Sequence, residues 1–135
     1  MANALFDSGR EGFLAGDIAW DTDDIRCCLV RGYTFSAAHT ALSDITGAGG
    51  TIVQSSSAFG TKTTTAGVAD AADVLFTAVP AGSPITSVII YKEGATDAAR
   101  KVIAFVDTGT GLPITPTGAD ITVAWSNGAN KIFKL

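Results

Sequence analysis

The chain has 135 residues, with 13 acidic and 9 basic side chains, a formal net charge of −4 and an isoelectric point near 4.7. This length fits one domain that buries a core without disulfides or metal ions. The acidic balance excludes nucleic acid as an expected partner, because the phosphate backbone selects basic surfaces. No stretch approaches the roughly 20 apolar residues that span a bilayer, so no membrane partner is expected.

The composition favours short strands joined by turns. Only 16% of the residues are charged, 15 are glycine, and threonine, serine and alanine are frequent. The opening "MANALFDSGREGF" has neither the basic region nor the apolar run of a signal peptide, so we expect synthesis in a reducing cytoplasm. The cysteines agree with this, since two adjacent residues make no disulfide framework.

Residues 1–19 are interpreted as an N-terminal arm. Their large apolar side chains have a loosely helical spacing, which two glycines weaken. These apolar residues are Leu5, Phe6, Phe13 and Leu14, and the glycines are Gly9 and Gly12. We predict a short or irregular helix that packs on a partner or on the single β-rich domain formed by residues 20–135.

The stretch "WDTDDIRCCLV" places three aspartates within four residues, directly before a predicted strand over residues 25–30. A calcium loop needs oxygen ligands at alternating positions and a later carboxylate, but Ile25 and Arg26 stand where ligands are wanted. We favour a solvated turn whose aspartates pair with Arg26 or Arg31, with calcium as the alternative. No cofactor or metal is expected.

Cys27 and Cys28 point to opposite faces if residues 25–30 form a strand. A disulfide between neighbours requires a strained ring, so both are interpreted as small apolar residues. Zinc is not favoured, because the cysteines lack the usual spacing and His39 is the only histidine. Residues 36–45 are interpreted as a short helix or a helical loop, with Ser36 as the candidate N-cap and His39 at a polar position.

From residue 51 onwards the pattern is β nearly throughout. Short strands are predicted over residues 51–57, 60–68 and 72–79. In the last of these, alternation sets Val74, Phe76 and Ala78 on one face; Leu75, Thr77 and Val79 on the other.

Two hairpins complete the predicted fold. The apolar runs over residues 86–94 and 100–109 form the first, and their continuity indicates burial on both faces. The second spans residues 120–135, where "SNGAN" carries an Asn-Gly turn signal and Trp125 is expected in the core. Together the pattern predicts a mainly β, single-domain antiparallel sandwich or barrel of about seven to eight short strands.

No motif in the sequence carries recognisable catalytic chemistry. "TGAGG" lacks the lysine and frame of a phosphate-binding loop, and no serine lies in a nucleophile elbow. We therefore expect no enzyme activity. Trp20, beside the acidic turn, is either a part-exposed interface anchor or a core residue that caps one end of the sheet.

Four segments together carry a resemblance. They are "GREGFLAGDIAWDTDDIRCCLV" at residues 9–30, "VADAADVLFTAV" at 68–79, "SVIIYKEG" at 87–94 and "GLPITPTGADITVAWSNGANKIFKL" at 111–135. They resemble a family of small virion structural proteins of tailed bacteriophages. The "GDI-W-DTDDIR" core is the most specific part, and residues 33–65 match least well.

The resemblance implies a non-catalytic virion component, made in the host cytoplasm. Its size and composition suit a capsid decoration, or cement, protein on the outer head shell, which stabilises contacts of the major capsid protein. Such proteins associate with their own copies, often as trimers, at symmetry axes. The arm would then order only on binding. The candidate interface residues are Leu5, Phe6, Arg10, Phe13, Trp20, Asp21, Asp23 and Asp24.

Two alternatives remain open at this stage. The first is a neck, tail or head-surface receptor-binding structural protein of the same kind of particle. The second is a small carbohydrate-binding β-sandwich, which would need an exposed patch of tryptophan and tyrosine. The chain has only two of each, scattered along the sequence.

Overall fold

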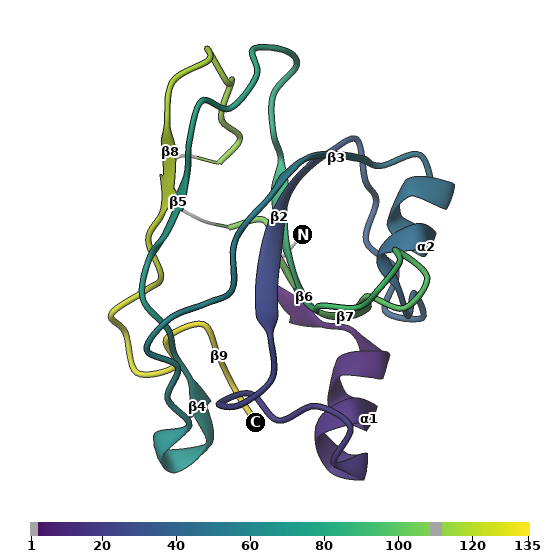
Figure 1. Cartoon of the computed structure of the whole chain (residues 1–135), viewed down its shortest axis with the longest axis vertical. Helices are drawn as coiled ribbons and strands as arrows, with labels where there is room; N and C mark the ends of the chain where they lie inside the picture. The colour runs from purple at the N-terminus through teal and green to yellow at the C-terminus, as the bar shows by residue number, and fades with distance from the viewer. Residues whose placement is uncertain (1–2, 109–111) are drawn as a thin grey trace.

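A five-stranded antiparallel sheet forms the centre of the molecule in the computed structural model, which describes residues 3–108 and 112–135 (Figure 1). The strand order is β1-β7-β6-β2-β3. These strands are β1 (Ala4–Leu5), β2 (Ile25–Arg31), β3 (Thr51–Ser55), β6 (Ser87–Lys92) and β7 (Lys101–Val106). Two parts of the predictions lie outside the described residues: residues 1–2 of the N-terminal arm, and residue 109 at the end of the predicted strand over residues 100–109.

Two short antiparallel ribbons lie on one side of this sheet (Figure 1). One pairs β4 (Val68–Ala69) with β9 (Phe133–Lys134), and a 3-10 turn, η1 (Thr65–Gly67), leads into β4. The other ribbon pairs β5 (Val74–Phe76) with β8 (Ile121–Val123). The predicted class, a mainly β antiparallel protein, is confirmed.

The described residues contain nine strands rather than seven or eight. The additional strand is β1, a two-residue pairing with β7. A pairing this short shows no period of alternation in the sequence, so the pattern did not reveal it.

The sheet separates two apolar core clusters. The first core cluster fills the space between the sheet and the ribbons, and the second lies against the opposite face, covered by α2 (Leu42–Gly47). Cys27 belongs to the first cluster and Cys28 to the second, as strand alternation predicts. The inner residues of β6 and β7 are buried continuously, which confirms the predicted two-sided burial and hairpin.

The N-terminal arm forms a helix, α1 (Asp7–Ala15), packed on β7 of the same chain. Of the two glycines that weaken the helical pattern, Gly9 makes this contact, whereas Gly12 lies against the Ile18 side chain. A Cβ atom on Gly9 would lie only 2.6 Å from the Ile103 carbonyl oxygen, so the backbones touch directly. Gly16 then ends the helix in a left-handed conformation. The expectation of an arm that orders only on binding is wrong for this folded chain.

The predicted C-terminal hairpin does not form. β8 pairs with β5 and β9 pairs with β4, so the segment after Val123 crosses from one ribbon to the other. Trp125 explains the difference. Its backbone amide donates to Asp73 Oδ1 at 3.0 Å, and its indole Nε1 donates to the Ala72 carbonyl at 3.1 Å. These long-range contacts outweigh the local Asn-Gly turn signal.

The predicted helix over residues 36–45 is displaced along the chain to α2. Ser36 does not cap it, because α2 begins only at Leu42, with Ala41 as its N-cap. The Ser36 amide instead donates to the Tyr33 hydroxyl at 3.2 Å. That hydroxyl also lies 2.7 Å from His39 Nδ1, which holds this segment as a loop. The loop then joins β7, where the Val102 amide donates to the Thr40 carbonyl at 3.1 Å.

The predicted strands over residues 60–68 and 72–79 are shorter than expected. The first reduces to a single bridge between Thr63 and Asp70, followed by η1. In the second, Val74 and Phe76 share the buried face, but Val79, predicted on the opposite face, is buried too. Ala78 takes a positive φ of 48°, which breaks the alternation and turns Val79 back into the core.

Candidate protein-interaction surface

The acidic turn is held by hydrogen bonds and ion pairs within the chain. The Ala19 amide donates to Asp23 Oδ2 at 2.8 Å, and this hydrogen bond lowers the pKa of Asp23. Lys92 Nζ, 3.1 Å from the same oxygen, lowers that pKa further. Arg26 donates from Nε and Nη2 to the two carboxylate oxygens of Asp24, each at 2.9 Å, and these hydrogen bonds lower the pKa of Asp24. The predicted pairing with Arg26 is therefore confirmed. Among the described residues, no three histidine, cysteine, aspartate or glutamate side chains group as metal ligands would.

Asp24 and Arg26 begin a chain of ion pairs that links β2 to the β6–β7 hairpin. Arg26 also lies 3.2 Å from Glu93, whose other oxygen accepts a hydrogen bond from Arg100. That hydrogen bond lowers the pKa of Glu93. Arg100 in turn reaches Asp97 at 2.7 Å. Because most charges here already have partners, this edge offers little free charge to another molecule.

Three of the candidate interface residues lie at the start of the arm, and their exposure differs sharply. Phe6 is 0% exposed and packs in the second core cluster, with its ring 5.0 Å from that of Phe35. Its predicted role as an interface anchor is wrong, because no partner can reach it. Leu5 is half-buried in β1, opposite Ala104. Arg10 is exposed, but it pairs with Asp7 and donates to the Leu5 carbonyl.

Trp20 is a core residue, 4% exposed, rather than a part-exposed anchor. Its indole Nε1 donates to the Asp70 carbonyl at 3.1 Å, which ties the acidic turn to the segment after β4. The alternative interpretation as a cap at one end of the sheet is the correct one. Of the turn's aspartates, Asp21 is exposed and enters no hydrogen bond or ion pair that we find in the described residues.

A row of aromatic rings runs from α1 across the first core cluster. The centroid distances along it are 5.8, 5.3, 6.0 and 5.5 Å. In order, the members are Phe13, Phe133, Trp20, Phe59 and Trp125. Tilted and edge-on pairs at these separations are favourable beyond the area they bury. The row joins the arm, the acidic turn and both ribbons into one unit.

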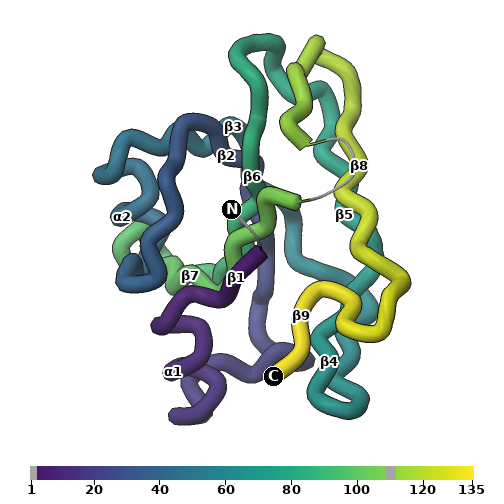
Figure 2. Tube along the Cα trace, turned by 180° about the vertical axis from the view of Figure 1, so that it is seen from behind, coloured from purple at the N-terminus to yellow at the C-terminus, as the bar shows by residue number. Residues whose placement is uncertain are grey.

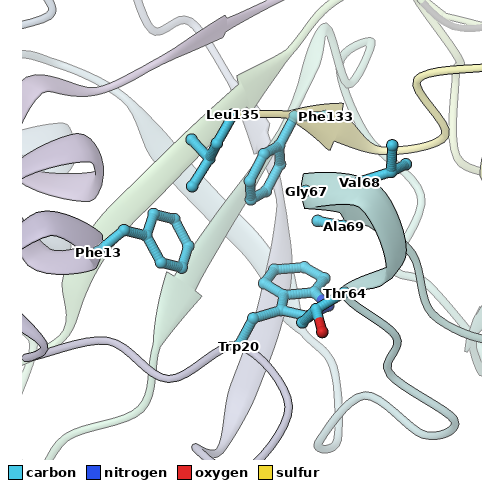
Figure 3. Close-up of a pocket in the computed structure, with 8 residues that line it drawn as sticks. All are labelled: Phe13, Trp20, Thr64, Gly67, Val68, Ala69, Phe133 and Leu135. Atoms are coloured by element: carbon cyan, nitrogen blue, oxygen red, sulfur yellow. The ribbon is translucent and has the colours of Figure 1, made fainter.

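At the arm's end of this row lies an apolar depression of about 150 Å³, which we call the hollow. Figure 3 shows the rings of Phe13, Trp20 and Phe133 around it, supplied by α1, the acidic turn and β9. Its lining residues are Phe13, Trp20, Thr64, Gly67, Val68, Ala69, Phe133 and Leu135. Seen from behind, the C-terminus reaches this region between α1 and β4 (Figure 2).

The hollow brings together two predicted site residues, Phe13 and Trp20, with a C-terminal set that the sequence did not single out. Leu135 is 60% exposed at its rim, and Leu14, next to Phe13 on α1, is 90% exposed. Their apolar character was visible in the sequence. The convergence of Phe133 and Leu135 with Phe13 and Trp20 was not, because β9 was assigned to a hairpin with the preceding strand.

A larger cleft of about 660 Å³ opens between the sheet and β8. Its floor is apolar, with Leu29 and Val88, but polar side chains such as Thr122, Ser126 and Asn127 line it as well. Water is well accommodated in a roomy site with several polar partners. The hollow, with almost purely apolar walls, is therefore the better candidate for binding an apolar protein group.

Comparison with known protein-family models gives no match for this chain, and comparison with curated protein sequences finds no match either. In the described residues, no helix has the length and apolar character needed to cross a membrane.

Proposed function

We propose that this protein is a non-catalytic structural component of a tailed-bacteriophage virion, and specifically a decoration protein of the outer capsid shell. The observation that carries the proposal is the resemblance of residues 9–30, 68–79, 87–94 and 111–135 to small phage virion proteins. The alternative position in the particle, at the neck or tail, is an outcome of the experiment below.

The strands of these four segments pair with one another, which supports treating the segments as parts of one resemblance. β2 from the first segment pairs with β6 from the third along six residues. The second and fourth segments pair twice, as β4 with β9 and as β5 with β8. The least similar region, residues 33–65, supplies α2 and the edge strand β3. The resemblance thus covers both ribbons and two of the three interior strands of the sheet, while β7 and the edge strands β1 and β3 lie outside it.

The proposed mechanism is stabilisation by many weak contacts. A rigid domain bound at each equivalent site of a symmetric shell bridges neighbouring major capsid subunits, and the contacts add through multivalency. Of the residues first considered for this contact, Arg10, Asp21 and Asp24 remain exposed. They replace Phe6 and Trp20 as the residues through which α1 and the acidic turn would meet the shell.

The test is the copy number of the protein relative to the major capsid protein in purified virions, measured by mass spectrometry with isotope-labelled peptides. The proposal expects a ratio near one, or a simple fraction set by the lattice. A few copies per particle would instead locate the protein at the neck or tail. Its absence from virions would refute the phage assignment altogether.

Add-back to particles that lack the protein examines the contact itself. Wild-type protein is expected to bind and to raise the temperature at which the heads release DNA. The double variant Arg10→Ala/Asp21→Ala is expected to bind more weakly. Thr122→Ala, an exposed change on β8, is the matched control. Equal binding by all three proteins would remove α1 and the acidic turn from the proposed interface.

A further inference from the structure

We propose that Asn127 is a site of spontaneous covalent modification, at which the side-chain amide is converted to a carboxyl group through a cyclic imide. The reaction consumes water and needs no oxidant or reductant. The proposal does not rest on the virion assignment, because it uses only this asparagine, the glycine after it and the loop that holds them.

The reaction is an attack of the main chain on the neighbouring side chain. The Gly128 amide nitrogen gives up its proton and bonds to Asn127 Cγ. The bond from Cγ to the side-chain nitrogen breaks, and ammonia leaves with the proton. Water then opens the imide ring at either carbonyl, which gives aspartate or isoaspartate. In isoaspartate the main chain runs through Cβ and Cγ. The balance is one amide and one water converted to one acid and one ammonia.

The first support is the freedom of the asparagine. Asn127 is exposed in the segment between β8 and β9, which crosses from one ribbon to the other (Figure 2). In the part of the chain that the structure describes, neither its side chain nor its backbone enters a hydrogen bond. Its side chain can therefore turn toward the next amide nitrogen without breaking a contact of the fold. The predicted hairpin would instead have fixed the residues on both sides of this dipeptide.

The second support is the residue that attacks. Gly128 has no Cβ atom to crowd the approach of its nitrogen to Cγ, and glycine adopts more backbone conformations than any other residue. Its amide takes no part in a strand ladder, because it donates to the Ser126 hydroxyl at 3.0 Å. Ser126 is exposed, so this hydrogen bond exchanges with water at little net cost.

The third support is the contrast with the other two asparagines of the chain. Asn3 Oδ1 accepts hydrogen bonds from two backbone amides at 2.9 and 3.0 Å, which fix its side chain. Asn130 is exposed in the same loop as Asn127, but the residue after it is Lys131, whose Cβ atom crowds the attacking nitrogen. Only Asn127 combines a free side chain with a following glycine.

The modification would change the charge of the larger cleft. Asn127 and Lys131 both line that cleft, and Lys131 is the only charged residue among its described lining residues. A carboxyl group at position 127 adds an acidic group there and makes the net charge of the chain one unit more negative than −4. The modified protein is therefore expected to bind more tightly to an anion-exchange resin.

Incubation of the folded protein at physiological temperature and pH 8, followed by peptide fragmentation in a mass spectrometer, tests the proposal. Asn127 is expected to be converted to a mixture of aspartate and isoaspartate. Asn130 is the internal control, and the loss of Asn127 is expected to be at least about tenfold faster. Because the attacking nitrogen must lose its proton, the rate should fall when the incubation is repeated at pH 6.

Gly128→Ala is the matched variant. Gly128 is not among the glycines with a positive φ, and a Cβ atom on it would meet only the Ser126 hydroxyl oxygen, at 3.1 Å, so this variant is expected to fold. It should slow the loss of Asn127 at least about tenfold. Gly47→Ala makes the same chemical change at an open position of α2 and should leave the rate unchanged.

Three results would overturn the inference. One is a loss of Asn127 that is no faster than the loss of Asn130. Another is an unchanged rate in Gly128→Ala, with circular dichroism confirming that the variant is folded. The third is conversion in urea but not in the folded protein, because the native loop would then hold Asn127 away from the Gly128 nitrogen.

Discussion

Cys27 and Cys28 illustrate how neighbouring residues serve different environments. Burial raises the pKa of the Cys27 thiol to about 12 and raises that of Cys28 as well. From an ordinary value near 9.0, the shift for Cys27 lowers its thiolate fraction about a thousandfold at neutral pH. Because the thiolate is the reactive species, both residues are expected to be inert in the folded protein.

Thiol titration with a chromogenic disulfide at pH 8 checks this expectation. The native protein should react at least about a hundredfold more slowly than the unfolded protein, in which both thiols titrate rapidly. Denaturant supplies the control on reagent and protein concentration. Prompt reaction of even one thiol in the native state would contradict the buried assignment.

Asp44, the third residue of α2, caps the N-terminus of this helix, a role predicted for Ser36. Its Oδ2 accepts the Thr40 amide at 2.8 Å and the Ala41 amide at 3.2 Å, and these bonds lower the pKa of Asp44. We expect Asp44→Ala to reduce the free energy of unfolding by about 1 kcal/mol at pH 7. Asp21→Ala, at an exposed turn position, should change it by less than about 0.5 kcal/mol.

The Asp44 effect should depend on pH in a defined direction. A carboxyl whose folded pKa is lowered stabilises the protein above its unfolded value near 3.8, and this stabilisation is lost as the pH falls through the folded value. Urea unfolding of wild type and Asp44→Ala at pH 7 and in acid measures it. The difference between the two proteins should shrink in acid, and a constant difference would mean that the carboxylate is not the capping group.

At the scale of the element, the contact between α1 and β7 depends on a missing side chain. A Cβ on Gly9 would lie 2.6 Å from a backbone oxygen of Ile103, which cannot move without disturbing β7. Gly9→Ala is therefore expected to cost about 1–3 kcal/mol, despite the better helix propensity of alanine. Gly47→Ala in α2 meets no atom within 4 Å and should be neutral or slightly stabilising. Equal stability of the two variants in urea would show that α1 does not pack closely on β7.

Phe6 distinguishes a core residue from an interface residue. Because its side chain is completely buried against Phe35, Phe6→Ala should destabilise the isolated domain by about 3–5 kcal/mol. Arg10→Ala, at an exposed position of the adjoining helix α1, should change stability by less than about 0.5 kcal/mol. If Phe6→Ala left the melting temperature unchanged and impaired only binding, the original interface assignment would be restored.

At the scale of the whole molecule, the two core clusters share the central sheet. Adjacent residues of β2 enter different clusters, and the aromatic row connects α1 to both ribbons. Neither cluster can lose its packing without exposing the sheet that also supports the other. We therefore expect one cooperative unfolding transition.

Urea unfolding followed by two probes measures this cooperativity. Trp20 and Trp125 both lie in the first core cluster, so tryptophan fluorescence reports on that side. Far-ultraviolet circular dichroism reports on the whole sheet and the helices. Coincident midpoints are expected at low micromolar protein concentration. A fluorescence transition that precedes the loss of circular dichroism would mean that the ribbons detach independently.

The sequence by itself determined the central strands and their burial. Long β-branched runs such as residues 86–94 form strands in most contexts, and alternation alone set Cys27 and Cys28 on opposite faces. The pairing of Asp24 with Arg26 was also accessible, because the two opposite charges lie only two residues apart where the turn meets the strand. These are local properties, in which the competing long-range contacts are weak or point the same way.

Only the tertiary structure decided the ribbons and the hollow. The paired residues of β8 and β9 lie between 45 positions (Phe76 to Ile121) and 66 positions (Val68 to Lys134) away along the chain. The bonds from Trp125 to Ala72 and Asp73 overrode the nearby turn signal. The burial of Phe6 and Trp20 likewise depends on which distant surface each one meets. A pairing that spans much of the chain leaves no period in the sequence, because its specificity comes from complementary packing rather than from neighbouring residues.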